Sequence, residues 1–208
     1  GDVYKRQHYK LMALIKKFRI KKFKEQRSIL KLQKISMFYN KRQILNSLDL
    51  NINQQEILGM LGPNGVGKST IFHIITGLRD PSFGKVLING IDCTNIPIYE
   101  RATKFKLGYV PQYGGFIQDL TLYENLNLVG EIHIKEKELR KSKIDKIISQ
   151  FEFDALLKIK AKHLSGGQKK KLVISMALIN DPSILLLDEP FAALDILTIK
   201  MLQEIIVN

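Results

Sequence analysis

One short stretch constrains the fold of this chain more than any other. GPNGVGKST, at residues 62–70, fits the pattern G-x-x-x-x-G-K-[ST]. It follows the apolar run EILGMLG, which is typical of a strand, and it opens a predicted helix over about 68–76 that Gly77 closes. Glycines in such a loop let backbone N–H groups wrap around phosphate oxygens, because side chains there would block the approach. The stretch therefore predicts a phosphate-binding loop between a strand and a helix.

Lys68 and Ser69 supply the charge and the hydroxyl that such a loop offers to a ligand. The Lys68 ammonium would neutralise charge between the β and γ phosphates of a nucleotide. The Ser69 hydroxyl would bind Mg²⁺, which prefers oxygen ligands.

A second stretch, ILLLDEP at residues 184–190, is an apolar strand that ends in Asp188 and is followed by Glu189. A carboxylate at the tip of a buried strand beside a phosphate loop is placed to bind the metal. The next carboxylate can polarise an attacking water. We therefore expect Asp188 to be a metal ligand and Glu189 a catalytic residue.

A third stretch, LSGGQKKK at residues 164–171, begins another apolar-periodic helix. Ser165, Gly166 and Gly167 leave backbone N–H groups available at its start, an arrangement that holds an anion. Two anion sites on separate elements can share one triphosphate only if a symmetric partner supplies the missing half. We expect the lysines at 169–171 to form a solvated face, with an assist to the nucleotide as the alternative.

These three stretches together resemble the ATP-binding cassette (ABC) family, and the resemblance covers nearly all of residues 29–208. It implies ATP and Mg²⁺ as ligands and a head-to-tail dimer, in which the LSGGQ signature of one copy closes over the ATP of the other. It implies an α/β fold, a P-loop NTPase cassette with a mainly parallel sheet, an antiparallel N-terminal β edge and a helical signature subdomain at about 113–178.

Three further positions take their expected roles from this resemblance. Gln112, in YVPQ, matches a glutamine that senses Mg²⁺ and the attacking water. Asp195, in AALD, matches an aspartate at the dimer seam, or is a plain helix N-cap. Tyr39 matches an aromatic residue that stacks on adenine, or packs in the core. The full set expected around the nucleotide is Tyr39, Gly62, Pro63, Asn64, Gly65, Val66, Gly67, Lys68, Ser69, Thr70, Ser165, Gly166, Gly167, Gln168 and Asp195, with Ser69, Gln112 and Asp188 on the metal and Glu189, Gln112 and Lys68 in catalysis.

Apolar periodicity and turn signals predict the other elements. Strands are expected at 29–39, at 48–52 after a turn at Asn46-Ser47, at 85–88 and at 107–110. Helices are expected from Thr121, which forms a capping box with Glu124, at 135–151 with an ion pair between Glu136 and Arg140, and at 195–207.

The net charge of +13 belongs to an N-terminal arm. Residues 1–43 hold 14 Lys and Arg against 2 Asp and Glu, whereas residues 44–208 hold 19 against 18. Residues 1–7, GDVYKRQ, look like a translated sequencing adaptor and are set aside. Residues 8–28 are a basic lead-in, or a helix on anionic lipid, and we expect no specific nucleic acid because no aromatic interleaving accompanies the charge.

Several features bear on location and partners. No stretch reaches the roughly 18 apolar residues that cross a bilayer, and the lone Cys93 permits no internal disulfide, so we expect a cytoplasmic protein, peripheral on the cytoplasmic face of the inner membrane. FIQDLTLYENL and DEPFAALD are similar to ATPase subunits of lipopolysaccharide exporters, although branched-chain amino-acid importers share much of the pattern. Polytopic membrane subunits would then be gripped near exposed Tyr113, Phe116 and Ile117. A soluble ABC ATPase, a chromosome ATPase or a kinase or GTPase fits less well.

Two departures from the family pattern bear on activity. The family's switch histidine would fall beyond Asn208, so we expect the chain as given to hydrolyse ATP poorly. Ile196 follows Asp195 where proline is common in the family.

Overall fold

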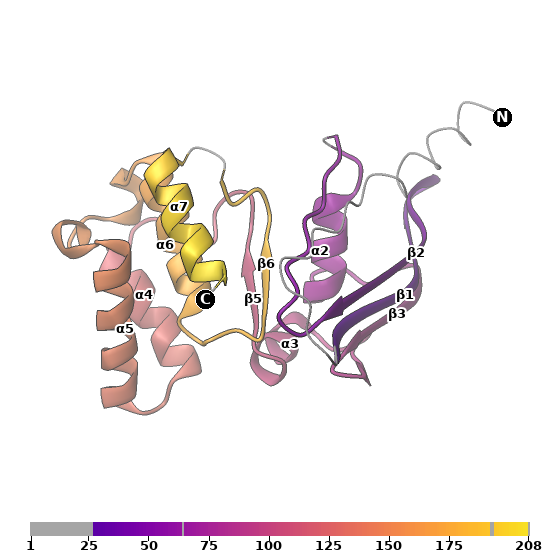
Figure 1. Ribbon diagram of the computed structural model, residues 1–208, viewed down its shortest axis with the longest axis horizontal. Coiled ribbons are helices and arrows are strands. Elements are labelled where there is room, and N and C mark those ends of the chain that lie inside the picture. Colours follow the sequence, from indigo (N-terminus) through magenta and orange to yellow (C-terminus); the bar gives the residue numbers. More distant parts are fainter. Residues whose placement is uncertain (1–26, 64, 192–193, 208) are drawn as a thin grey trace. The chain divides into compact units, whose positions relative to one another are not determined.

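The computed structural model describes residues 27–63, 65–191 and 194–207, and the chain divides into two compact units after Phe105 (Figure 1). Asn64 and the basic arm up to residue 26 lie outside the described residues. The predicted α/β class is confirmed, with an antiparallel sheet in the N-terminal unit and a parallel sheet in the C-terminal unit.

The N-terminal unit is built on a four-stranded antiparallel sheet in the order β2-β1-β3-β4. Its strands are β1 (Ser28–Tyr39), β2 (Arg42–Asn53), β3 (Phe83–Ile88) and β4 (Ile91–Asp92), and its helices are α2 (Lys68–Thr76) and α3 (Ile98–Lys104) (Figure 1). Apolar residues alternate along β1, where Leu30 and Leu32 are fully buried, because successive side chains of a strand point to opposite faces.

The first hairpin differs from the sequence prediction. Its turn lies at residues 40–41, where Asn40 adopts φ 52°, and β2 runs on through Asn46-Ser47 as a bulge. Ser47 there has φ 46°, and its backbone N–H donates to the hydroxyl of Ser36 at 2.9 Å. A bulge inserts an extra residue without ending the strand, which is why the turn signal at this point was misleading.

The run EILGMLG forms no strand, contrary to the prediction. A strand needs a neighbour to pair with its backbone groups, and no described strand of the N-terminal unit pairs with this run. Helix α2 follows as predicted and ends at Gly77, which adopts the left-handed conformation with φ 80°.

The C-terminal unit holds β5 (Leu107–Val110) and β6 (Ile184–Leu187), which pair in parallel from Leu107 opposite Ile184 to Val110 opposite Leu187. Helices α4 (Leu122–His133), α5 (Lys137–Phe151), α6 (Gly166–Leu178) and α7 (Ile196–Val207) belong to the same unit, together with the short 3-10 helices Asp154–Leu156 and Ala161–His163 (Figure 1). Their apolar faces share one core, in which Phe151 and Phe153 stack with ring centroids 5.6 Å apart.

Two local predictions for these helices have different outcomes. The capping box at the start of α4 is confirmed, since the Thr121 hydroxyl accepts from the Glu124 N–H and the Glu124 carboxylate accepts from the Thr121 N–H. The ion pair between Glu136 and Arg140 is wrong: the Arg140 guanidinium lies 3.8 Å from Glu131 and donates to the Ile134 carbonyl instead.

No helix in the described part of the chain is long and apolar enough to cross a bilayer. Cys93 is a buried free thiol that donates to the Val86 carbonyl, and burial raises the pKa of this thiol.

Candidate functional site

The predicted phosphate loop lies between the end of β2 and helix α2 and depends on glycine at two positive φ angles. Gly65 has φ +75° and Gly67 has φ +106°. A Cβ on Gly67 would also lie 3.0 Å from the Leu45 side chain, so the loop packs against the sheet at this point. Its backbone can therefore turn tightly just before the helix begins at Lys68.

The Lys68 ammonium folds back over its own loop. It donates to the carbonyl oxygens of Gly62 at 2.6 Å and Pro63 at 3.0 Å. A cation held there, at the first turn of α2, adds to the positive end of the helix dipole. The residues present therefore suit the phosphates of a nucleotide, with Ser69 on the next position of the same turn as an oxygen ligand for Mg²⁺.

In the C-terminal unit the structure brings together Gln112 and Glu189, which are 77 positions apart in the sequence. The Gln112 side-chain amide donates to Oε2 of Glu189 at 2.7 Å. Gln112 follows β5 and Glu189 follows β6, and the two strands run parallel, so their carboxyl ends meet at one edge of the sheet. The predicted water-sensing amide and the predicted base are thus direct neighbours.

Asp188 and Glu189 differ in environment although they are adjacent. The Asp188 side chain is buried, and its backbone N–H donates to the Val110 carbonyl at 2.9 Å, which extends the pairing of β5 and β6. Burial of the Tyr109 ring raises the pKa of Tyr109, and the negative charge of Asp188 adds a smaller contribution in the same direction. Glu189 has φ 48°, a left-handed conformation that is uncommon for a non-glycine residue and clusters at functional sites.

The signature stretch begins α6 with a second capping box. The Ser165 hydroxyl accepts from the Gln168 N–H at 3.2 Å, and the Gln168 side chain accepts from the Ser165 N–H at 2.9 Å. The N–H groups of Gly166 and Gly167 lie in the first turn, where a helix supplies no acceptor of its own. This end of α6 is therefore suited to bind an anion, as the sequence predicts.

Lys170 is a residue that the sequence prediction misjudged. The expected solvated lysine face does not hold at this position, because Lys170 is 8% exposed and its ammonium donates to the carbonyls of Pro111 and Gln112 at 3.2 and 3.3 Å. Burial lowers the pKa of Lys170, and the charges of Asp188 and Glu189 oppose that shift. The only signal in the sequence was its position on the inward side of an apolar-periodic helix.

Tyr39 and Asp195, both expected near the nucleotide, make contacts with other residues of this chain. Tyr39 is half-buried at the end of β1, and the Arg79 guanidinium lies over its ring, 5.2 Å from the centroid. The carboxylate of Asp195 accepts from the Thr198 N–H at 2.9 Å and from the Thr198 hydroxyl at 2.7 Å. This is the N-cap geometry that the sequence left open as an alternative for Asp195.

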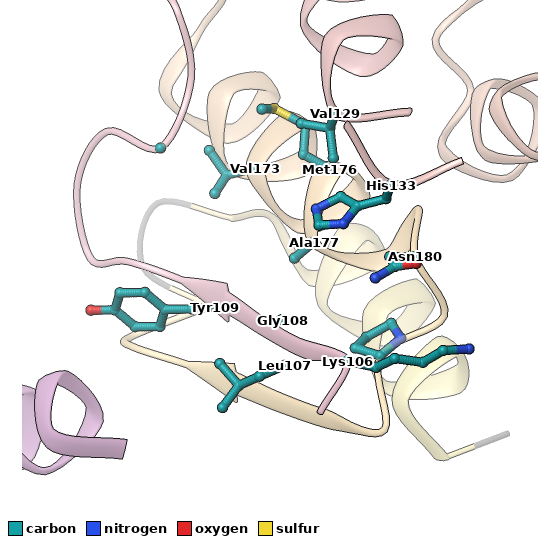
Figure 2. Close-up of a pocket in the computed structure, with 12 residues that line it drawn as sticks. Lys106, Leu107, Gly108, Tyr109, Val129, His133, Val173, Met176, Ala177 and Asn180 are labelled. Carbon is teal, nitrogen blue, oxygen red and sulfur yellow. The ribbon is translucent and has the colours of Figure 1, made fainter. Parts of the chain in front are cut away.

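The residues predicted to contact a membrane partner differ in exposure. Tyr113 is 83% exposed and Ile117 is 48% exposed, whereas Phe116, expected to be exposed, packs partly buried against the core of its unit. A cavity of about 200 Å³ lies between β5, α4 and α6, and Gly115 of the neighbouring segment is part of its lining (Figure 2). Its lining combines polar and apolar groups, namely Lys106, Leu107, Gly108, Tyr109, Gly115, Val129, His133, Val173, Met176, Ala177, Asn180 and Pro182.

Comparisons with known proteins give a consistent result. The family model described as ABC transporter matches residues 45–192. An uncharacterized ABC transporter ATP-binding protein of Rhizobium meliloti is 39% identical over 81% of this chain, which spans 62% of that protein's length. The lipopolysaccharide export system ATP-binding protein LptB of Haemophilus influenzae is 36% identical over 87% of this chain and 75% of its own length.

Solved structures agree with the sequence comparisons. A dimeric ATP-binding cassette in a post-hydrolysis state, bound to ADP and Pi, has a TM-score of 0.77 and 29% identity, and the match covers 86% of this chain and 83% of that one. An ATP-binding subunit of an ABC transporter has a TM-score of 0.78 and 28% identity, with coverage of 86% and 73%.

Proposed function

The chain belongs to the ATP-binding cassette (ABC) transporter family, and from this we propose that it is the subunit that binds and hydrolyses ATP to drive a membrane transporter. The ATPase domain covers residues 29–208 in this proposal, with its helical subdomain at about 113–178. The observation that carries the proposal is the 2.7 Å hydrogen bond between Gln112 and Glu189, because it joins the amide that would orient a water to the carboxylate that would accept its proton.

The reaction assigns a distinct step to each residue. The loop at residues 62–70 and Lys68 hold the phosphates, and Glu189 accepts a proton as water attacks the γ-phosphorus. The bond from that phosphorus to the bridging oxygen breaks, and ADP and phosphate leave. Ser69, Gln112 and Asp188 would hold Mg²⁺, which would offset the charge that develops on the phosphate oxygens.

A second copy of the chain completes the site in this proposal. The end of α6, with Ser165, Gly166 and Gly167, would bind the γ-phosphate of ATP held by the partner's phosphate loop. Asp195 would lie at the seam and Tyr39 against adenine. The dimeric state of a cassette at 29% identity supports this arrangement.

The decisive experiment is Glu189→Gln in the full-length protein, which removes the base and keeps the shape. Phosphate release should fall by about 10³-fold while ATP affinity stays within about twofold. ATP with Mg²⁺ should then drive the variant into a stable dimer, measured by light scattering. A variant that hydrolyses ATP at the parent rate, or that stays monomeric with saturating ATP, would contradict the proposal. Lys146→Met, an exposed position on α5, is the control.

The membrane partner is the finer part of this proposal. The side chains of Tyr113 and Ile117 are exposed and would form an apolar surface on which a helix of a polytopic subunit can dock. Gly115, which lies between them in the sequence, lines the cavity. The protein would then lie peripherally on the cytoplasmic face of the inner membrane. Tyr113→Asp and Ile117→Asp should abolish co-purification with the membrane subunits and leave ATP binding unchanged, and retained co-purification would reject this surface.

We propose lipopolysaccharide as the transported substrate class, supported by LptB proteins at 36% identity in Haemophilus influenzae and 32% in Escherichia coli. The alternative is another transporter, such as a branched-chain amino-acid importer. In proteoliposomes that contain the assembled complex, added lipopolysaccharide should stimulate ATP hydrolysis, and branched-chain amino acids should not. Stimulation by the amino acids alone would reverse this assignment.

A further inference from the structure

Lys170 is buried at a position where a charged side chain lowers stability unless other groups compensate for its lost hydration. Its ammonium is withdrawn from water, and its two hydrogen-bond acceptors are the backbone carbonyls of Pro111 and Gln112 rather than a carboxylate. Burying a cation carries a desolvation penalty that two neutral carbonyls repay only in part. The negative charges of Asp188 and Glu189, in the same unit, offset a further part of that penalty.

A continuous set of contacts runs from α6 to Glu189 through this lysine. Lys170 lies on α6, little more than one turn after Ser165. Its ammonium holds the Gln112 carbonyl at 3.3 Å, and the side chain of that same residue donates to Oε2 of Glu189 at 2.7 Å. All of these groups belong to the C-terminal unit, so the set is internal to one compact body.

On the basis of the proposed ATPase function, we propose that Lys170 is a positioning residue that fixes the backbone at Gln112, so that its amide orients the Glu189 carboxylate for proton transfer. A hydrogen bond at Oε2 restrains rotation of the carboxylate and leaves Oε1 available as the proton acceptor. Lys170 also ties that amide to the helix whose first turn would bind the partner's ATP. Movement of α6 would therefore be transmitted to the base.

The nature of the contact predicts which substitutions matter. Lys170→Met keeps the aliphatic length and removes all three donors, so both carbonyls lose their partner. Lys170→Arg keeps a positive charge with several donors and should retain the contact. Because Lys170 touches neither ATP nor water in this proposal, its loss should act on the chemical step and not on nucleotide binding.

The test measures ATP hydrolysis and ATP affinity in the full-length protein. Lys170→Met should lower kcat by about tenfold or more and change KM and ATP affinity by less than about twofold, because a small displacement of a catalytic group is enough to slow the reaction. Lys170→Arg should recover kcat to within about threefold of the parent. Lys146→Met on α5 is the matched control for loss of one exposed lysine.

A double-mutant cycle separates positioning from general structural support. If Lys170 acts through Gln112, Gln112→Ala with Lys170→Met should be no slower than Gln112→Ala alone. Multiplied losses in the double variant, or a Lys170→Met protein with the parent kcat, would overturn the inference. Should Lys170→Met fail to fold, the Lys170→Arg and Lys170→Gln proteins carry the test: kcat must fall in the order parent, Arg, Gln at constant KM, and any other order refutes the inference.

These outcomes are distinct from failure of the proposed function. A parent protein without ATPase activity, or a Glu189→Gln protein that keeps it, would remove the function itself. An active parent that depends on Glu189 but ignores Lys170 would remove only this inference.

Discussion

Among the described residues, each unit of the chain buries one cation against backbone carbonyls, and the two cations differ in what they contact. In the N-terminal unit, Arg101 is fully buried and donates to four carbonyls, those of Ile74, Ile75, Thr94 and Ile96, at 2.6 to 3.0 Å. In the C-terminal unit, Lys170 is 8% exposed and donates to two. Arg101 binds the last turn of α2, far along the helix from the phosphate loop, whereas Lys170 binds the residue that reaches Glu189.

The difference teaches how the same interaction can serve stability or a site. A guanidinium has five donors in a rigid plane and satisfies many acceptors at once, which suits a structural junction. An ammonium has three donors and here satisfies two carbonyls, which suits a contact that holds one neighbouring segment in place. We therefore expect loss of Arg101 to appear as instability and loss of Lys170 to appear mainly as slow chemistry.

The largest expected effect is Arg101→Met. The substitution removes a donor from four carbonyls, and among the described residues only that of Ile74 keeps another donor, the Gly77 N–H at 3.3 Å. Each of the three carbonyls that remain buried and unsatisfied costs about 1–3 kcal/mol, so the free energy of unfolding should fall by about 3 kcal/mol or more. Urea denaturation followed by circular dichroism measures it. Lys170→Met should cost clearly less, and equal losses for the two variants would break the comparison between the two cations.

A somewhat smaller effect is expected at Gly77, which lies against Arg101. A Cβ there would lie 2.8 Å from the Arg101 Nε atom, and φ is +80°, so Gly77→Ala should cost about 2 kcal/mol of unfolding free energy. The control is Gly90→Ala in the same unit: its φ is +79° but nothing lies within 4 Å of the added Cβ, so only the conformational cost remains. If both variants lose the same stability, packing against Arg101 is not what requires glycine.

The candidate residues of the N-terminal unit are easier to recognise in the sequence than the contacts of the C-terminal unit, for a physical reason. The phosphate loop is contiguous, so the spacing of its glycines and Lys68 is visible directly. The contacts of Gln112 with Glu189 and Lys170 join positions 77 and 58 apart, and only the parallel pairing of β5 with β6 and the packing of α6 bring them together. Lys170 is buried although lysine is polar, and the apolar periodicity of one helix does not predict which of its polar residues are buried by tertiary packing.

The errors have the same origin in missing tertiary information. The bulge at Asn46-Ser47 carries turn-forming residues but lies inside a paired strand. Arg140 finds the Ile134 carbonyl and Glu131 rather than the partner at helical spacing. By contrast, the capping box of α4 was predicted correctly, because all of its atoms lie within four residues. The capping box of α6 was not predicted, although Ser165 and Gln168 have the same spacing.

The two capping boxes give a prediction of intermediate size within the C-terminal unit. Thr121→Ala and Ser165→Ala should each lower the unfolding free energy by about 1 kcal/mol, since each removes the hydroxyl that accepts an N–H in the first turn. Only Ser165→Ala should also weaken dimer formation with ATP, which sedimentation in the Glu189→Gln background measures. A matching defect in Thr121→Ala would assign the effect to stability alone.

The smallest expected effect concerns His133, whose ring lines the cavity on the α4 side (Figure 2). Burial lowers the pKa of His133 below its ordinary 6.5, so the unfolded chain binds a proton more readily than the folded one. The contribution of His133 to the free energy of unfolding should therefore be constant above pH 7.5 and should decline as the pH falls through 6.5 toward the lower folded pKa. His133→Gln should flatten that part of the decline, measured as the difference between variant and parent in urea titrations from pH 7.5 to 5, so that contributions from other groups cancel. Parallel pH profiles for the two proteins would mean that water reaches the His133 ring and that burial does not lower its pKa.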